Sequence, residues 1–229
     1  MNNIAIITAR GGSKRIPRKN VKLFCGQPII YYSIKAALES NLFSEVMVST
    51  DDDEIAKISR ELGAKVPFKR SVENSNDFAT TADVVKEVLD VYSSIGKEFD
   101  NVCCIYPTAP FLDDKTLIKS YDFFISEKYD SIFPVVEYSV PIQIALKINH
   151  LNYLEMISPE YMSVRSQDME KRYFDAGQFY WSKVTAFLEH TNLYTKKTGA
   201  FIMDELNYQD IDNVQDWEIA EFKFKFKNR

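Results

Sequence analysis

Long apolar runs, an excess of basic residues and paired cysteines are all missing from this 229-residue sequence. No run approaches the roughly 18 apolar residues of a membrane span, and no signal-peptide pattern opens the chain, so we expect a cytoplasmic protein with no membrane partner. The 28 Lys and Arg residues are outnumbered by 33 Asp and Glu residues, for a net charge of −5. This acidic balance argues against a general nucleic-acid coat protein, which is usually basic.

Cysteine and histidine are scarce. Cys25, Cys103 and Cys104 do not form the CxxC pairs of zinc and redox sites, and the adjacent Cys103 and Cys104 lie in an apolar run typical of a core. His150 and His190 have no metal-ligating partner at a useful spacing. By contrast, 45% apolar and 14% aromatic residues are ample for a core. We therefore expect one large domain, or one domain with a smaller appendage.

The most informative stretch is residues 4–20, a short apolar, β-branched run that ends in a glycine pair and a basic loop. Five cations follow the run, at Arg10, Lys14, Arg15, Arg18 and Lys19. Glycines let backbone N–H groups approach an anion and cations offset its charge, so the pattern indicates a polyphosphate site. The loop matches neither GxxxxGK[ST] nor GxGxxG. A solvated basic loop, or one that contacts RNA, is the alternative interpretation.

Strand-like and helix-like segments alternate over the first 137 residues. We predict strands at 4–9, 45–50, 65–68, 101–106 and 131–136, and helices at 28–40, 51–62, 80–96 and 115–127. This rhythm is typical of an α/β fold with a doubly wound, mostly parallel sheet. Ligands of such sheets bind at the carboxyl ends of the strands. The loops expected there are residues 10–20, 51, 70–81 and 107–110.

The rhythm breaks at residues 138–174, where alternation at 142–148 and a turn at 149–152 predict a small antiparallel excursion. Such an excursion is often an oligomer contact or a lid over a site. The α/β pattern then resumes with strands at 177–181 and 200–204 and helices at 183–189 and 215–222. We expect the tail at 223–227 to be a frayed helix end or a solvated segment. The predicted division is therefore residues 1–137 and 175–229 for the α/β domain, with 138–174 inserted.

Two carboxylates, Asp210 and Asp212, lie on the same side of an extended segment. Mg²⁺ takes one or two protein carboxylates and completes its shell with water and phosphate oxygens, so this pair would suit it. Helix capping is the alternative for acids just before a helix. The phosphate-binding loop elsewhere in the chain favours the metal-binding interpretation.

Several segments together resemble the sugar cytidylyltransferases, especially the CMP-sialic acid synthetases. The matching residues are 10–20, 49–51, 70 with 77–81, 107–110 and 210–212, in the family's order and approximate spacing. The resemblance implies a nucleotide-diphospho-sugar transferase-like fold and Mg²⁺-dependent transfer of CMP from CTP to the anomeric hydroxyl of a 2-keto acid sugar, with release of pyrophosphate. It also suggests a homodimer.

The resemblance implies roles for individual residues. Lys19, Lys14 and Asp212 would be catalytic, with Asp212 or Asp210 as general base and both as metal ligands. The residues that would bind CTP are Arg10, Gly12, Ser13, Lys14, Asn20, Arg70, Thr80 and Thr81. The residues that would bind the sugar are Tyr106, Gln143, Arg165, Gln178 and Tyr180, with Arg165 pairing with the sugar carboxylate.

Within the family, residues 103–111, 165–168 and 175–181 are most similar to members that use pseudaminic acid. CMP-sialic acid synthetases typically carry Gln at the position of Tyr106, and a Lys two residues after a proline where Pro141 is followed by Ile142 and Gln143. Both differences would fall in the sugar site. N-acetylneuraminic, legionaminic and 3-deoxy-octulosonic acids remain alternative substrates, and a non-catalytic nucleotide-binding module remains an alternative of another class.

Overall fold

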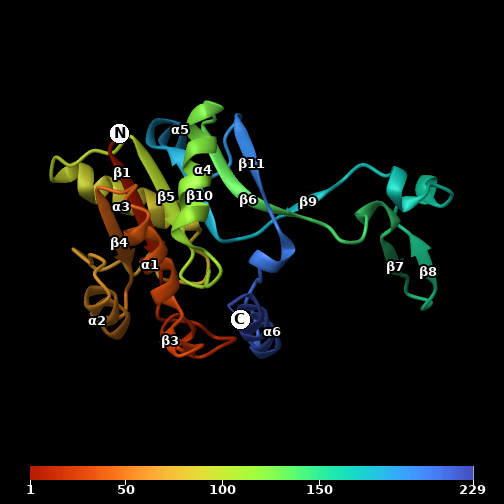
Figure 1. Cartoon of the computed structure of the whole chain (residues 1–229), viewed down its shortest axis with the longest axis horizontal. Coiled ribbons are helices and arrows are strands. Elements are labelled where there is room, and N and C mark those ends of the chain that lie inside the picture. The colour runs from red at the N-terminus through yellow and green to blue at the C-terminus, as the bar shows by residue number, and fades with distance from the viewer. Residues whose placement is uncertain (229) are drawn as a thin grey trace.

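A computed structural model describes residues 1–228 of the chain (Figure 1). A central seven-stranded sheet has the order β11-β6-β10-β5-β1-β4, with β9 paired to β6. Its strands are β1 (Asn3–Thr8), β4 (Glu45–Ser49), β5 (Asn101–Ile105), β6 (Ser131–Glu137), β9 (Tyr173–Asp175), β10 (Phe179–Lys183) and β11 (Thr198–Met203). The α-helices are α1 (Ile30–Glu39), α2 (Asp53–Glu61), α3 (Thr81–Ser94), α4 (Asp114–Ser126), α5 (Val184–His190) and α6 (Val214–Lys227).

The predicted α/β fold with a mostly parallel sheet is confirmed. β1 is parallel to both β4 and β5, and β11 is parallel to β6. β10 is antiparallel to β5 and β6, and β9 is antiparallel to β6. The reversed direction of β10 was not predicted, because a buried strand's composition does not indicate which way it runs.

Helices cover both faces of the sheet, and the alternating side chains of β1 pack against both layers of helices. Successive side chains of a strand point to opposite faces. Ala5 and Ile7 join the core beneath α1, α2 and α4, whereas Ile4 and Ile6 join the core beneath α3 and α5. All four are fully buried. A strand buried on both sides must be apolar throughout, which is why this run is so visible in the sequence.

Two predicted elements need correction. The strand expected at 65–68 is wrong: only a bridge between Met47 and Lys65 forms, because Pro67 has no N–H to continue the ladder. Helix α1 begins at Ile30, two residues later than predicted, because Pro28 belongs to the ribbon of β2 (Leu23–Phe24) and β3 (Gln27–Pro28).

The C-terminal tail agrees with the first of its two predicted alternatives, a helix end. Helix α6 continues through residues 223–227, beyond the predicted end near residue 222. Phe224 packs edge-on against Phe24 and Tyr32, with ring centroids 5.4 Å and 5.1 Å apart. These aromatic contacts pack the last turns of α6 against the rest of the protein. They explain why the helix extends beyond residue 222, where it was predicted to end.

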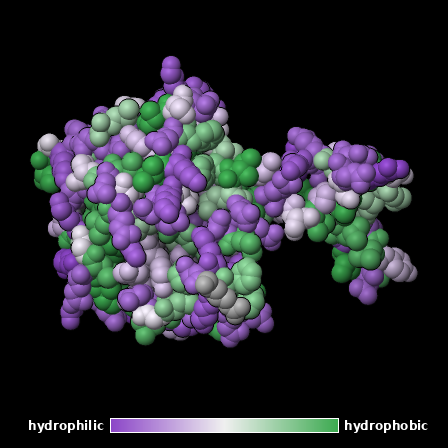
Figure 2. Space-filling view, viewed as in Figure 1, coloured by the Kyte–Doolittle hydropathy of each residue, from purple (hydrophilic) through white to green (hydrophobic). Residues whose placement is uncertain are grey.

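Residues 138–172, hereafter the arm, leave the body and extend away from it (Figure 1). The arm carries a hairpin of β7 (Leu146–Ile148) and β8 (Leu154–Met156) and three short 3-10 helices, η2 (Ile142–Ile144), η3 (Pro159–Tyr161) and η4 (Ser166–Asp168). Apolar side chains gather on its surface (Figure 2). Ile148 and Leu154 are 67% and 68% exposed. Within residues 1–228, no helix is both long and apolar enough to cross a membrane.

Candidate active site

A cavity of about 480 Å³ opens at the carboxyl ends of β1 and β5, where a ligand of such a sheet is expected. Three segments build it: the basic loop after β1, the polar loop before α3 and the turn after β5. The lining residues are Thr8, Arg10, Ser13, Lys14, Arg15, Lys19, Asn20, Arg70, Asn74, Asn76, Asp77, Ala79, Thr80, Thr81, Val84, Tyr106, Pro107 and Thr108.

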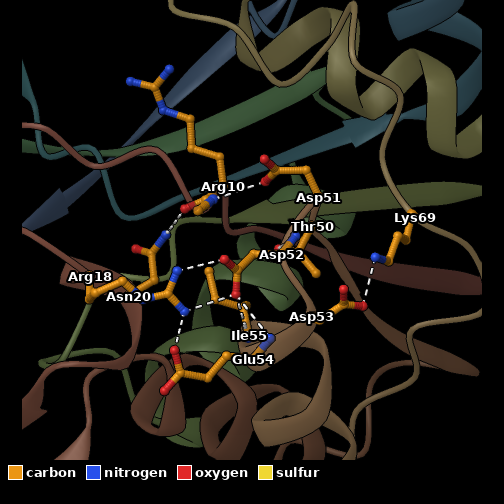
Figure 3. Close-up of polar contacts among 11 residues, drawn as sticks. Arg10, Arg18, Asn20, Thr50, Asp51, Asp52, Asp53, Glu54, Ile55 and Lys69 are labelled. Carbon is orange, nitrogen blue, oxygen red and sulfur yellow. Dashed lines mark hydrogen bonds and ion pairs between the residues drawn. The ribbon is translucent and has the colours of Figure 1, made fainter.

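The basic loop gives the cavity its charge. Four of its five cations, Arg10, Lys14, Arg15 and Lys19, line the cavity. Arg18 is the exception, because its guanidinium pairs with Asp52 and Glu54 at the start of α2 (Figure 3). Such a concentration of positive charge in a net acidic protein creates a local potential that attracts a polyanion. The cavity therefore suits a polyphosphate.

Asp77, on the polar loop before α3, already contacts two of these cations. Its carboxylate accepts from Arg10 at 2.9 Å and from Lys14 at 2.5 Å. Hydrogen bonds from Lys14 and then Arg10 lower the pKa of Asp77, so the carboxylate stays ionised at neutral pH. A polyphosphate bound by Arg10 and Lys14 would compete with Asp77 for the same donors.

The other end of the basic loop meets the C-terminal acids. Lys19 Nζ donates to the Ile211 carbonyl at 2.7 Å, and Arg15 pairs with Asp212 at 2.7 Å. A small core holds the two segments together, since Ile16 from the loop and Ile211 between the acids are both buried in one apolar cluster with Trp217. Residues almost 200 positions apart thus meet because their apolar neighbours share a core.

At this junction, burial and the neighbouring carboxylates shift the pKa of Lys19 in opposite directions. Burial lowers the pKa of the Lys19 ammonium, whereas the carboxylates of Asp212 and Asp210 act in the opposite direction. Asp210 is exposed, but partial desolvation, followed by the neighbouring Asp212 carboxylate, raises its pKa. A cation bound between the two carboxylates would relieve their repulsion.

The opposite wall of the cavity is more polar than charged. Arg70 is only 7% exposed and donates from Nε to the Ser49 hydroxyl at 2.9 Å. Burial lowers the pKa of Arg70. Thr80 forms a capping box with Asp83 and so fixes the start of α3. Thr81, in the first turn, lies within 3.2 Å of the Tyr106 hydroxyl. This wall offers hydrogen-bonding groups suited to a nucleoside.

The predicted sugar-binding residues fall in three places. Tyr106 lines the cavity, and burial raises its pKa. Gln178 and Tyr180 lie behind it: the Gln178 carbonyl accepts from the Tyr106 N–H at 2.8 Å, and the Tyr180 ring is 5.4 Å from the Tyr106 ring. Gln143 and Arg165 belong to the arm, which extends away from the body (Figure 1).

Most of the predicted CTP-binding residues are brought together. Arg10, Ser13, Lys14, Asn20, Arg70, Thr80 and Thr81 all line one cavity, together with the predicted catalytic Lys19. Gly12 lies outside the cavity lining. Asn20 has a further contact, since its amide donates to the Arg10 carbonyl at 2.9 Å and ties one end of the basic loop to the other.

Several lining residues were not predicted as site residues. Arg15 was visible as one of the five loop cations, and Asp77 belongs to a segment that already stood out. Asn74 and Asn76 gave no signal, because short polar loops are common and carry no pattern. Their positions follow from the fold, which places the loop before α3 beside the end of β1.

Asp210 and Asp212, the predicted metal ligands, lie beside the cavity, because Asp212 pairs with Arg15 and the Ile211 carbonyl between them accepts from Lys19. The part of the chain covering residues 1–228 has no cluster of three His, Cys, Asp or Glu side chains that would form a complete site. Two carboxylates suffice for Mg²⁺ when substrate phosphates and water complete the octahedron. The donor set therefore fits Mg²⁺ together with a polyphosphate, although Asp212 would share its charge with Arg15.

Comparison with known proteins agrees with the chemistry that the cavity suggests. Residues 4–204 match the family described as Cytidylyltransferase. The pseudaminic acid cytidylyltransferase of Campylobacter jejuni is 40% identical over 225 residues, or 98% of this chain and 97% of that protein. The CMP-N,N'-diacetyllegionaminic acid synthase of Legionella pneumophila is 31% identical over 232 residues, with 96% and 95% covered. A solved CMP:2-keto-3-deoxy-manno-octonic acid synthetase complexed with CTP has a TM-score of 0.71 at 17% identity, covering 99% of this chain and 100% of that one, and so shares its fold.

Proposed function

The chain belongs to the cytidylyltransferase family, and we propose that it transfers CMP from CTP to the anomeric hydroxyl of pseudaminic acid, with release of pyrophosphate. The observation that carries this proposal is the junction of Arg15 with Asp212 and of Lys19 with the Ile211 carbonyl. It joins a cationic cavity of about 480 Å³ to a pair of carboxylates. The 40% identity to a pseudaminic acid cytidylyltransferase supports the choice of sugar.

The reaction would join the sugar to the nucleotide by attack on the α-phosphorus. The anomeric oxygen forms a bond to that phosphorus, and the bond from the phosphorus to the oxygen that bridges to the β-phosphate breaks. Pyrophosphate leaves with that oxygen, and a carboxylate of Asp212 or Asp210 accepts the hydroxyl proton. Catalysis of this kind is mostly positioning and charge stabilisation.

Different residues of the cavity would bind the triphosphate, stabilise the developing charge and bind the cytidine. Arg10, Ser13 and Lys14 would hold the triphosphate, since they line the cavity on the basic loop. Lys19, half-enclosed at the junction with the acids, would stabilise the charge that develops as pyrophosphate departs. Asn20, Arg70, Thr80 and Thr81 would bind the cytidine end. A buried arginine in a wall of this kind loses little conformational entropy on binding.

Mg²⁺ is proposed as the metal, with Asp210 and Asp212 as its ligands. Their closeness supports this, since the Asp212 carboxylate contributes to the raised pKa of Asp210 and both carboxylates act on the pKa of Lys19. When bound, the ion would supply Lewis-acid stabilisation of the phosphate oxygens. The protein's own part is to hold the carboxylates still: the Asp216 carboxylate accepts from the Asp212 N–H at 2.9 Å and fixes that turn.

We also propose a homodimer that uses the arm. Apolar side chains are exposed on both hairpin strands and beyond, and such a patch usually marks an interface. The exposed residues are Leu146, Ile148, Leu151, Tyr153, Leu154, Ile157 and Met162. Arg165 and Gln143 could then contribute to a sugar site only if the arm covers a cavity. The arm would either bend back over the cavity of its own chain or cover the cavity of the second copy.

The sugar is tested by one panel of acids with CTP and Mg²⁺, scored by pyrophosphate release. The panel contains pseudaminic, N-acetylneuraminic, legionaminic and 3-deoxy-octulosonic acids. We expect pseudaminic acid to give the highest kcat/KM. Equal turnover of N-acetylneuraminic acid would overturn the sugar assignment but leave the enzyme class intact. Tight CTP binding without turnover of any acid would favour a non-catalytic nucleotide-binding module.

A further inference from the structure

Among the described residues of the basic loop, Arg18 is the one cation that does not line the cavity, and its guanidinium points to the start of α2 (Figure 3). Its guanidinium forms a two-pronged contact with Asp52, from one terminal nitrogen at 2.5 Å and from the other at 2.9 Å, and it also contacts Glu54. Bidentate contacts of this type fix the geometry of both partners. Arg18 therefore acts on the loop and not on a ligand.

The backbone at Arg18 is left-handed, with φ 55° and ψ 30°. A residue with a Cβ rarely adopts this conformation, so something must hold it there. Arg18 also directly precedes η1 (Lys19–Val21), and its carbonyl accepts from the Val21 and Lys22 N–H groups at 3.0 Å. The direction in which Lys19 and Asn20 enter the cavity is thus set by the turn at Arg18.

Asp52 is itself rigid. It caps α2, accepting from the Glu54 and Ile55 N–H groups at 3.0 Å each, and only 21% of its side chain is exposed. The hydrogen bond from Arg18 is the main reason that the pKa of Asp52 falls to about 2. The carboxylate is therefore charged at every pH at which the protein would work.

The start of the basic loop is held against the same helix end. The Gly11 N–H donates to Asp51 at 2.9 Å. A Cβ added at Gly11 would lie 2.8 Å from an Asp52 carboxylate oxygen and 2.9 Å from its Cβ, so only glycine fits there. Asp51 and Asp52 thus fasten both ends of the loop to one rigid point.

We propose that Arg18 and Asp52 form a positioning pair, which holds the left-handed turn before Lys19 and so aims Lys19 and Asn20 at the nucleotide. The pair touches no substrate. The positioning role rests on the proposed function only in its kinetic test, and measuring CTP binding tests it separately. Losing the pair should let the turn relax and misplace the Lys19 ammonium, and small misplacements of catalytic groups have large effects on rate.

Three variants separate the side chain's contact from the backbone's shape. Arg18→Ala removes the ion pair and keeps a Cβ at the left-handed position. Arg18→Gly removes the same ion pair but adopts that conformation at little cost. Asp52→Asn removes the charge while keeping a good cap for α2. Lys69→Ala is the control, because Lys69 pairs with Asp53 at the same helix end, 2.6 Å away.

Kinetics and CTP affinity are measured at a temperature where circular dichroism shows every variant folded, with CTP, Mg²⁺ and pseudaminic acid. We expect Arg18→Ala to lower kcat about 10- to 100-fold and to weaken CTP binding, by calorimetry, about three- to tenfold. Arg18→Gly should recover much of both losses, and Lys69→Ala should match the wild type. Combining Arg18→Ala with Asp52→Asn should cost no more than Arg18→Ala alone, because Arg18→Ala already removes the contact between Arg18 and Asp52.

Two results would overturn the positioning role. One is an Arg18→Ala enzyme that matches the wild type in both kcat and CTP affinity. The other is an Arg18→Gly enzyme as impaired as Arg18→Ala, with the loss confined to KM, which would make Arg18 a simple source of positive charge. If the wild type binds CTP but turns over no acid, the proposed function fails, and the order of CTP affinities among the variants still decides the positioning role.

Discussion

Replacing Asp77 by Asn should strengthen CTP binding, the opposite of what is usual for a residue lining a ligand cavity. The Asp77 carboxylate contacts both Arg10 and Lys14, which are proposed to hold the triphosphate. CTP must displace that carboxylate before it can use either cation. The asparagine side chain of the Asp77→Asn variant would keep the size and most hydrogen bonds of the loop but lose the competing charge.

The size of the effect follows from exposure. The side chains of Arg10, Lys14 and Asp77 are 38%, 79% and 43% exposed, so water and salt screen both contacts. Exposed ion pairs of this kind each alter an equilibrium by about 1.5- to 5-fold. With two contacts released, the Kd for CTP should fall about three- to tenfold at low ionic strength. The gain should shrink in high salt, where the Debye length is only a few ångströms.

Isothermal titration calorimetry with CTP, at low and high salt, measures this change. Asp53→Asn is the matched control: it removes an equal charge from a side chain that is 87% exposed and pairs with Lys69 instead of a cavity cation (Figure 3). The control should leave the Kd nearly unchanged. If Asp77→Asn binds CTP no tighter than the control, or more weakly than the wild type, Arg10 and Lys14 do not bind the triphosphate as described.

Three further predictions concern the junction, the core and the arm. Lys19→Met should lower kcat about 100-fold or more with the fold intact by circular dichroism, because a preorganised charge is lost; turnover within threefold of wild type would remove Lys19 from the catalytic set. Glu45→Gln should lower the free energy of unfolding by about 1–2 kcal/mol at pH 7 in urea, because Glu45 is buried and accepts from Lys65, Lys97 and Tyr92. Burial alone would raise the pKa of Glu45, but the hydrogen bonds from Lys97, Lys65 and Tyr92 outweigh burial and lower that pKa. The wild type should therefore have the higher free energy of unfolding above the usual Glu pKa of about 4.3, and this advantage over the variant should vanish as pH falls below it. Ile148→Asp with Leu154→Asp should give a monomer by light scattering, and a dimer that survives both changes would place the interface elsewhere.

The parts of the fold that rest on local chemistry could be predicted from the sequence. The buried strands gave continuous apolar runs, acids lie at the start of α2 at Asp52 and Asp53, and the helix predicted at 80–96 begins with Thr80 as its cap. The antiparallel direction of β10 could not be predicted, because it depends on where the chain returns from the arm. The failed strand at 65–68 had a visible signal in Pro67, which ends the ladder.

The site divides in the same way. A dense group of cations beside glycines predicted a phosphate-binding loop, and the spacing of Asp210 and Asp212 together with the resemblance predicted a metal site; both roles stay predictions, while the structure shows that the loop and the acids meet. The part played by Arg18 could not be predicted, since an arginine gives no sign of a left-handed backbone and its partner Asp52 lies 34 positions away. The contact of Asp77 with two cations likewise appears only when the loops are assembled in space.

The most direct test of the account is to follow the phosphorus atoms of CTP by ³¹P NMR during incubation with the protein, Mg²⁺ and pseudaminic acid. Cleavage at the α-phosphorus should convert the triphosphate signals into equal amounts of pyrophosphate and a CMP phosphodiester. Formation of CDP and inorganic phosphate, or unchanged CTP, would contradict the claim that the basic loop and the C-terminal carboxylates act together on one nucleotide.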